Sequence, residues 1–91
     1  MDLADRAARL ARIERMRVSG EAERIRAGAG ISARQLAKTL RVAPITVLRW
    51  EANLSRPRPE VALAWLAQLE RIAAELTPGA SSAEPPPKSV D

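Results

Sequence analysis

The chain has 91 residues, a formal net charge of +4, and neither cysteine nor histidine. It is long enough for one small domain with short extensions. The missing thiol and imidazole exclude disulfides and remove the commonest metal ligand and general base. Composition therefore argues against an enzyme, and we expect no metal and no other cofactor.

Positive charge is concentrated in the middle of the chain. Residues 28–58 carry six basic side chains and a single acidic one, Glu51, whereas residues 59–91 carry two basic and five acidic side chains. A local basic surface attracts phosphate groups, although scattered arginines are usually just solvated surface. The charged start of the chain is unlike a signal peptide, and no apolar run reaches the roughly 18 residues of a membrane span. These features predict a soluble, intracellular protein.

Helices are expected from the start of the chain. Residues 2–18 contain no Gly or Pro and are rich in Ala and Arg, which are good helix formers. The arginines of this segment are spread around the helix, so we expect most of them to be solvated; the alternative is an arm that binds DNA. Ser19 and Gly20 then indicate a break, with Ser19 as a candidate N-cap of a short helix over 20–27.

Two further short helices are predicted after the glycines at positions 28 and 30. Ser32 is the candidate N-cap of a helix over 33–40. The next helix covers 43–52: if Ala43 is its cap, Pro44 occupies the first helical position, where its missing N–H is not needed. Asn53 is suited to the left-handed conformation that ends a helix.

The longest helix is predicted over 60–76. Its apolar residues recur at alternating spacings of three and four, and form a possible dimer seam of Ala62, Trp65, Leu69, Ile72 and Leu76. Leu63, Leu66 and Ala73 lie on a neighbouring face, and a helix that is apolar on two faces needs two partners. One partner is the core of the same domain. The second is either the N-terminal helix of the same chain or another subunit.

Together these segments predict an all-α protein. Residues 1–18 form an extra N-terminal helix, residues 19–76 form a compact domain of four to five helices, and residues 77–91, rich in Pro and Ser, form a disordered tail.

The paired helices over 33–40 and 43–52 resemble those of the lambda Cro and repressor family, the XRE-type helix-turn-helix DNA-binding proteins. The resemblance covers about residues 19–70. It is carried by a proline-containing loop after the second helix and by Leu36, Ala37, Val42, Thr46, Val47, Trp50 and Glu51.

This resemblance implies that helix 43–52 is a recognition helix that contacts base edges through Ala43, Pro44, Ile45 and Arg49. Arg49 is the only one of these that can make a bidentate contact with guanine; the alternative is an exposed helix charge. Candidate phosphate contacts are Ser32, Arg34, Thr46, Arg56 and Arg58. The family also implies a structural ion pair between Arg26 and Glu51.

The chain departs from the family pattern at three positions. Ala33 replaces a Gln that commonly grips phosphate, Arg41 replaces a Gly in the turn, and Ala52 replaces an Asn near the end of the recognition helix. Two expected phosphate contacts are therefore missing.

The function that we expect is sequence-specific binding of double-stranded DNA by a transcriptional regulator of the repressor or Cro type, from a phage or a bacterium. Its partners would be DNA and a second copy of the chain, with no small-molecule ligand and no membrane. It would act in the bacterial cytoplasm, at the nucleoid. The alternative is a protein-interaction module on the same fold, such as an antitoxin or a phage protein that binds a host factor.

Overall fold

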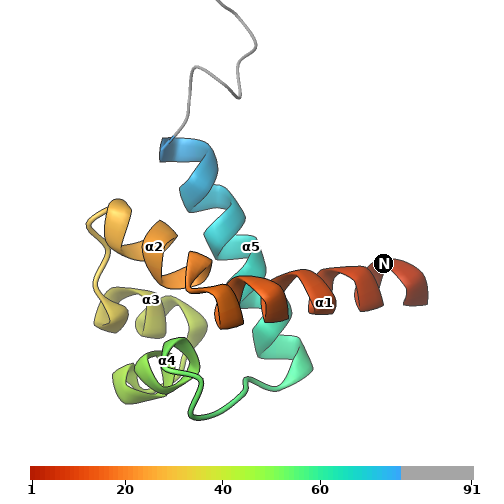
Figure 1. The fold of residues 1–91 in the computed structure, drawn as a ribbon, viewed down its shortest axis with the longest axis horizontal. Helices are drawn as coiled ribbons and strands as arrows, with labels where there is room; N and C mark the ends of the chain where they lie inside the picture. The colour runs from red at the N-terminus through yellow and green to blue at the C-terminus, as the bar shows by residue number, and fades with distance from the viewer. Residues whose placement is uncertain (77–91) are drawn as a thin grey trace, which may run out of the picture.

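The structure is a computed structural model that describes residues 1–76, and this part of the chain forms five α-helices without a strand. The helices are α1 Leu3–Ser19, α2 Glu21–Gly28, α3 Ala33–Leu40, α4 Pro44–Glu51 and α5 Pro59–Leu76 (Figure 1). The predicted all-α fold with an extra N-terminal helix is confirmed. The tail predicted over 77–91 lies outside the described residues. Within 1–76, no helix has the length and hydropathy that crossing a membrane requires.

Local side-chain chemistry explains where α3 and α4 begin. Ser32 Oγ accepts a hydrogen bond from the Gln35 N–H at 3.0 Å, and Gln35 Oε1 accepts one from the Ser32 N–H at 2.7 Å. This reciprocal capping box satisfies two backbone donors at the start of α3. At α4, Ala43 is the N-cap and Pro44 is the first helical residue. Both predicted starts are confirmed.

Ser19 is not an N-cap, so this prediction is wrong. Ser19 is the last residue of α1, and Gly20 serves both as the C-cap of α1 and as the N-cap of α2. Gly20 has a φ of 86°, a conformation that glycine adopts at little cost. Ser19 Oγ still accepts a weak hydrogen bond from the Glu21 N–H at 3.3 Å.

Two non-glycine residues adopt left-handed backbone conformations at helix ends. Asn53 has a φ of 63°, as predicted, and follows the end of α4. Arg41 has a φ of 61° and caps the C-terminus of α3. Asparagine tolerates this region, whereas for arginine it costs on the order of 1 kcal/mol. The turn between α3 and α4 therefore stores a small strain where the family usually has glycine.

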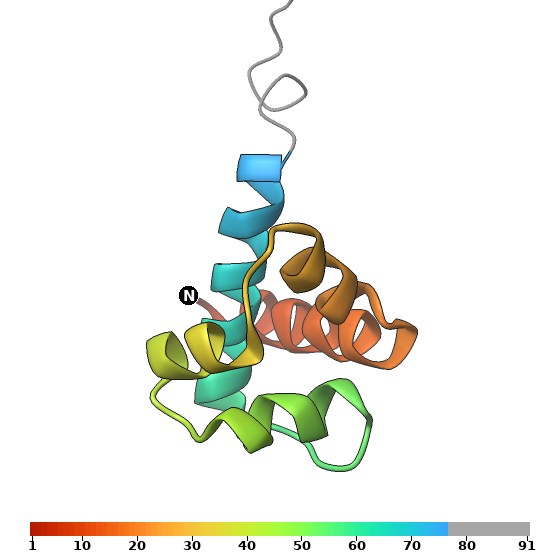
Figure 2. The same ribbon diagram turned by 90° about the vertical axis from the view of Figure 1, so that its left-hand side faces the viewer.

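The hydrophobic core is built around α5. Trp65, Leu66 and Leu69 are fully buried there, and α1, α2 and α3 all pack against this helix. Trp65 also lies against Trp50 of α4, with ring centroids 5.0 Å apart. Figure 1 shows α5 crossing α1 with α2, α3 and α4 on one side, and Figures 1 and 2 both show its C-terminal end extending beyond the other helices.

Helix α1 belongs to this core and is more than an extension. Ile13 and Met16 in its second half are buried in the same cluster as the side chains of α5, whereas its first half projects away from the other helices (Figure 1). Of the two second partners considered for α5, the N-terminal helix of the same chain is therefore present.

The predicted dimer seam is largely filled within the protomer. Ala62, Trp65 and Leu69 are buried by the chain's own helices, whereas Ile72 is half-buried and Leu76 is exposed. The first three cannot lie in a subunit interface, because other helices of the same chain already cover them. The prediction of a five-residue seam therefore needs correction: only Ile72 and Leu76 remain accessible to a second subunit.

Candidate nucleic-acid interface

Helix α4 has one buried face and one exposed face. Val47 and Trp50 point into the core. The helical repeat of 3.6 residues places Ile45 and Arg49 on the opposite side, and both are exposed, as are Ala43 and Pro44 at the start of the helix. All four residues assigned to base contacts therefore lie where a ligand could reach them.

Leu48 is a surface residue that the sequence analysis missed. It lies next to Ile45, about one turn further along the helix, and its side chain is 45% exposed, close to the 51% of Ile45. The spacing of three residues from Ile45 could have identified it. The outward face of α4 thus consists of two neighbouring apolar side chains beside one arginine.

The start of α3 offers free backbone donors next to α4. The capping box uses the N–H groups of Ser32 and Gln35. Within residues 1–76, the N–H groups of Ala33 and Arg34 have no hydrogen-bond acceptor. A helix N-terminus of this kind suits a phosphate group, and the exposed side chain of Arg34 lies beside it. Ser32 is exposed too, but its hydroxyl oxygen already serves as the cap.

The loop between α4 and α5 carries the other predicted phosphate contacts. Arg56 and Arg58 are both exposed. Arg56 Nη2 lies 3.9 Å from Glu14 Oε2 of α1, whereas Arg58 makes no salt bridge within the described part of the chain. Thr46, the remaining candidate, is half-buried on the flank of α4.

Arg26 and Glu51 are brought together as a bidentate pair. Arg26 Nε lies 2.7 Å from Glu51 Oε2, and Arg26 Nη2 lies 2.9 Å from Glu51 Oε1. The pKa of Arg26 is raised, mainly by this hydrogen bond and against the effect of burial. The side chain of Glu51 is only 5% exposed.

Burial of Glu51 changes the surface charge of the segment. Glu51 is the single acidic residue of 28–58, and its carboxylate is both hidden and neutralised by Arg26. The remaining charges of this segment are the six basic side chains, all of which are exposed: Arg34, Lys38, Arg41, Arg49, Arg56 and Arg58. A phosphate backbone would therefore meet a surface on which this segment presents no carboxylate.

The three departures from the family pattern have clear structural positions. Ala33 is half-buried against the core, so the first residue of α3 has no side chain for gripping phosphate. Arg41 is exposed in the turn, and Ala52 is exposed as the C-cap of α4. Only Arg41 adds a charge in place of the usual residue.

Arg17 of α1 is an exception to the expectation that most arginines of this helix are solvated, because it is the buried one among them. Its side chain is only 5% exposed. It bonds to Glu14 in its own helix and to Asn53 at the end of α4. Arg9 and Arg12 are also paired, both with Glu70 of α5. Packing of α1 on α5 accounts for the two pairs with Glu70. The contact of α1 with the end of α4 accounts for the bond between Arg17 and Asn53.

No group of three or more acidic, histidine or cysteine side chains in the described residues has the arrangement of a metal site. This surface instead presents basic side chains, free backbone N–H groups and a small apolar patch.

Comparison with known protein families identifies a match. The sequence model of the helix-turn-helix family matches residues 23–74, more than half of the chain. The match contains α3 and α4 completely and leaves α1 outside. No curated protein and no solved structure matches significantly.

Proposed function

This chain belongs to the helix-turn-helix family of the XRE and Cro type, a family of DNA-binding transcription regulators, and we propose that it recognises a specific sequence in double-stranded DNA and represses transcription there. The observation that carries the proposal is the outward face of α4. It presents Ile45, Leu48 and Arg49 within a segment whose single carboxylate is buried.

A recognition helix reads base edges in the major groove. In the proposed complex, Arg49 donates two hydrogen bonds to a guanine, while Ile45 and Leu48 contact thymine methyl groups. Ala43 and Pro44 lie at the N-terminus of α4. The N-terminal residues of a recognition helix are the ones that contact base edges. This assignment gives each exposed side chain of the helix face a partner of matching chemistry.

Phosphate contacts would fix the protein on the duplex. The free N–H groups at the start of α3, with Ser32 and Arg34, would contact one strand. Thr46 and the loop residues Arg56 and Arg58 are the other proposed contacts. The exposed positions of the three arginines support this assignment.

We also propose that the protein binds as a homodimer to an operator of bacterial or phage DNA, at the nucleoid of the host cell. Two-fold symmetric dimers that read two half-sites are the usual arrangement for this motif. Ile72 and Leu76 at the end of α5 remain accessible for such a contact.

A salt titration tests the DNA-binding part of the proposal. Binding of a labelled duplex of mixed sequence is followed by fluorescence anisotropy at several salt concentrations. We expect log K to fall linearly with log salt, and the slope to become shallower by about one for Arg58→Gln. Arg71→Gln, at an exposed position of α5, is the matched control and should leave the slope unchanged. Absence of binding at low salt, or equal effects of the two variants, would contradict the proposal.

The second candidate function is a protein-interaction module, such as an antitoxin or a phage protein that binds a host factor. It is favoured by the apolar side chains exposed near the proposed interface, since Ile45, Leu48 and Leu54 are all exposed. The absence of a phosphate-gripping side chain at Ala33 points the same way. A failed titration would favour this candidate.

A further inference from the structure

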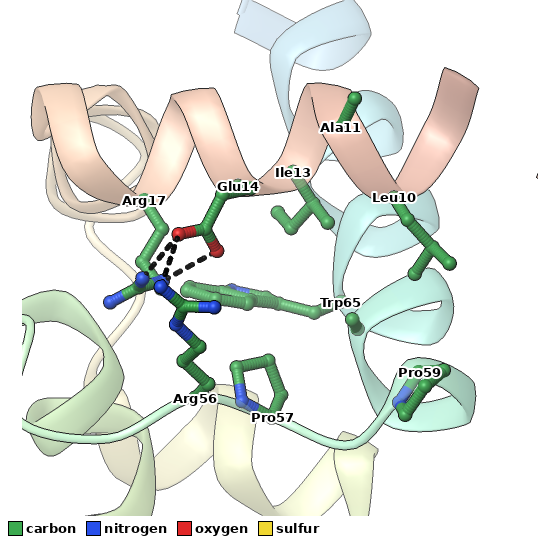
Figure 3. A pocket seen from close by; sticks show the side chains of 10 residues that line it. Leu10, Ala11, Ile13, Glu14, Arg17, Arg56, Pro57, Pro59 and Trp65 are labelled. Carbon is green, nitrogen blue, oxygen red and sulfur yellow. Dashed lines mark hydrogen bonds and ion pairs between the residues drawn. The ribbon is translucent and has the colours of Figure 1, made fainter. Parts of the chain in front are cut away.

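Four polar side chains from three segments meet beside the second half of α1. Glu14 and Arg17 come from α1, and Arg56 lies in the loop before α5 (Figure 3). Asn53, which follows the end of α4, accepts a hydrogen bond from Arg17. We call these four residues the loop cluster. Glu14, Arg17 and Arg56 line one end of a pocket of about 300 Å³. The apolar residues of this pocket include Leu10, Ile13, Pro57, Pro59 and Trp65.

Arg17 holds the fixed part of the loop cluster. Its Nη2 lies 2.6 Å from Glu14 Oε2 and its Nε lies 3.2 Å from Glu14 Oε1, while Nη1 donates to Asn53 Oδ1 at 2.9 Å. Because Arg17 is buried and Asn53 has a left-handed backbone that closes α4, the Glu14 carboxylate is held at a defined place next to the end of the recognition helix.

Arg56 is bound only weakly to the loop cluster. Its Nη2 lies 3.9 Å from Glu14 Oε2, and its side chain is 78% exposed. Exposed ion pairs of this kind contribute little to stability and are easily exchanged. Its partner Glu14 nevertheless carries a negative charge, because its pKa is lowered. The hydrogen bond from Arg17 is the main cause and outweighs the opposite effect of burial, and the charges of Arg17 and Arg56 lower the pKa further.

We infer that Glu14 is an internal counter-ion for Arg56, which exchanges the carboxylate for a DNA phosphate when the protein binds. Carboxylate and phosphate oxygens offer a guanidinium group the same kind of charge-assisted hydrogen bond. Arg17 keeps Glu14 in place during this exchange, so the carboxylate continues to compete with the phosphate for Arg56. Glu14 therefore weakens DNA binding. This inference rests on the proposed function.

The inference also gives α1 a part in DNA binding. Glu14 and Arg17 precede the segment 23–74 that matches the family, so this contribution belongs to the added helix. When Arg56 neutralises a phosphate, cations condensed on the DNA are released, but a Glu14 carboxylate that loses Arg56 takes up a cation in turn. The net release is therefore smaller than for an arginine without such a partner. The salt dependence of binding should therefore report whether the pair exists in solution.

The test compares Glu14→Gln, Arg56→Gln and the double variant in duplex binding by the full chain. Glutamine keeps an oxygen that can accept from Arg17 but removes the charge. We expect Glu14→Gln to tighten binding roughly two- to fivefold at low salt, the range that corresponds to one exposed ion pair. It should also steepen the slope of log K against log salt by up to about one. In the Arg56→Gln background, both effects should disappear.

Glu70→Gln is the matched control. Glu70 is another half-exposed carboxylate that is paired with arginines of α1, but it lies outside the loop cluster, so its removal should change neither affinity nor slope. Equal tightening by Glu14→Gln with and without Arg56 would overturn the inference, because it would mean simple long-range repulsion. An unchanged or weaker affinity of the folded Glu14→Gln variant would overturn it too.

Folding is checked by circular dichroism for every variant. If Glu14→Gln does not fold, Arg56→Gln is compared with Arg58→Gln. The inference then expects Arg56→Gln to reduce the salt slope less than Arg58→Gln, since only Arg56 has an internal counter-ion; equal reductions would contradict it. Failure of the proposed function is distinguishable, because then the unmodified chain itself shows no salt-dependent binding to duplex DNA.

Discussion

Arg26 and Glu51 join α2 to the last turn of α4 by two parallel hydrogen bonds of 2.7 and 2.9 Å. Arg26 Nη1 also donates to the carbonyl oxygen of Ile31 at 2.8 Å. The same guanidinium group thus holds the end of the proposed recognition helix and the loop that leads into α3. Its position explains how a small domain fixes both helices of the motif relative to α2.

Removing one partner of this pair should destabilise the fold strongly. We expect Glu51→Ala to cost about 3–5 kcal/mol of unfolding free energy, because the buried charge of Arg26 loses its partner. The double variant with Arg26→Ala should cost less than the sum of the two single changes. Urea unfolding followed by tryptophan fluorescence measures all three. Additive effects would show that the two side chains do not interact in solution.

Arg49 should determine preference at one base pair. We expect Arg49→Ala to lose about 1–3 kcal/mol of discrimination at that position while other positions keep their ranking. The measurement is the relative affinity for single-base variants of the best duplex. Arg34→Ala is the control, and it should weaken binding to every variant by the same factor. If Arg49→Ala left the relative affinities for these duplexes unchanged, Arg49 would not contact a base in the groove.

Arg41→Gly should stabilise the protein. The left-handed backbone at Arg41 is strained for arginine, so glycine should gain roughly 0.5–1 kcal/mol despite its greater freedom in the unfolded chain. Arg34→Gly, in the first turn of α3, removes the same side chain without relieving strain and should destabilise. The comparison uses urea midpoints; a loss of stability in both variants would contradict the backbone argument.

Stability should decrease at acidic pH in part through Glu14. The pKa of Glu14 is lower in the folded protein than its usual value of 4.5. Its contribution is therefore complete above that value and is lost as pH falls through the lowered, folded pKa. Unfolding free energies at about pH 6 and pH 3 should differ less for Glu14→Gln than for the unmodified chain. Equal differences would show that Glu14 titrates alike in both states.

Local sequence signals predicted the helix-turn-helix itself. The range of α3 was predicted correctly because Ser32 makes a strong capping signal, and Pro44 marked the start of α4. The resemblance to the family indicated the Arg26–Glu51 pair, which joins residues that are 25 positions apart and which no local pattern could reveal.

Contacts of α1 and α5 could not be predicted in the same way. The three-and-four spacing of α5 shows that two faces are apolar, but it does not say which element covers each face. Arg17 and Asn53 are 36 positions apart and carry no motif, so their hydrogen bond depends on how α1 packs. Ser19 was misplaced because Gly20 allows a direct link between α1 and α2, where a polar cap is not needed.

Selection of bound duplexes from a random DNA library, at two salt concentrations, would show whether the protein recognises a specific DNA sequence. We expect an enriched palindrome whose half-sites lie about one helical turn, or a multiple of it, apart, as for a dimer. A single asymmetric site would keep the sequence-specific reading but replace the dimer by a monomer. If no sequence is enriched and binding disappears at moderate salt, the basic segment attracts DNA without reading it, and the proposed operator recognition is contradicted.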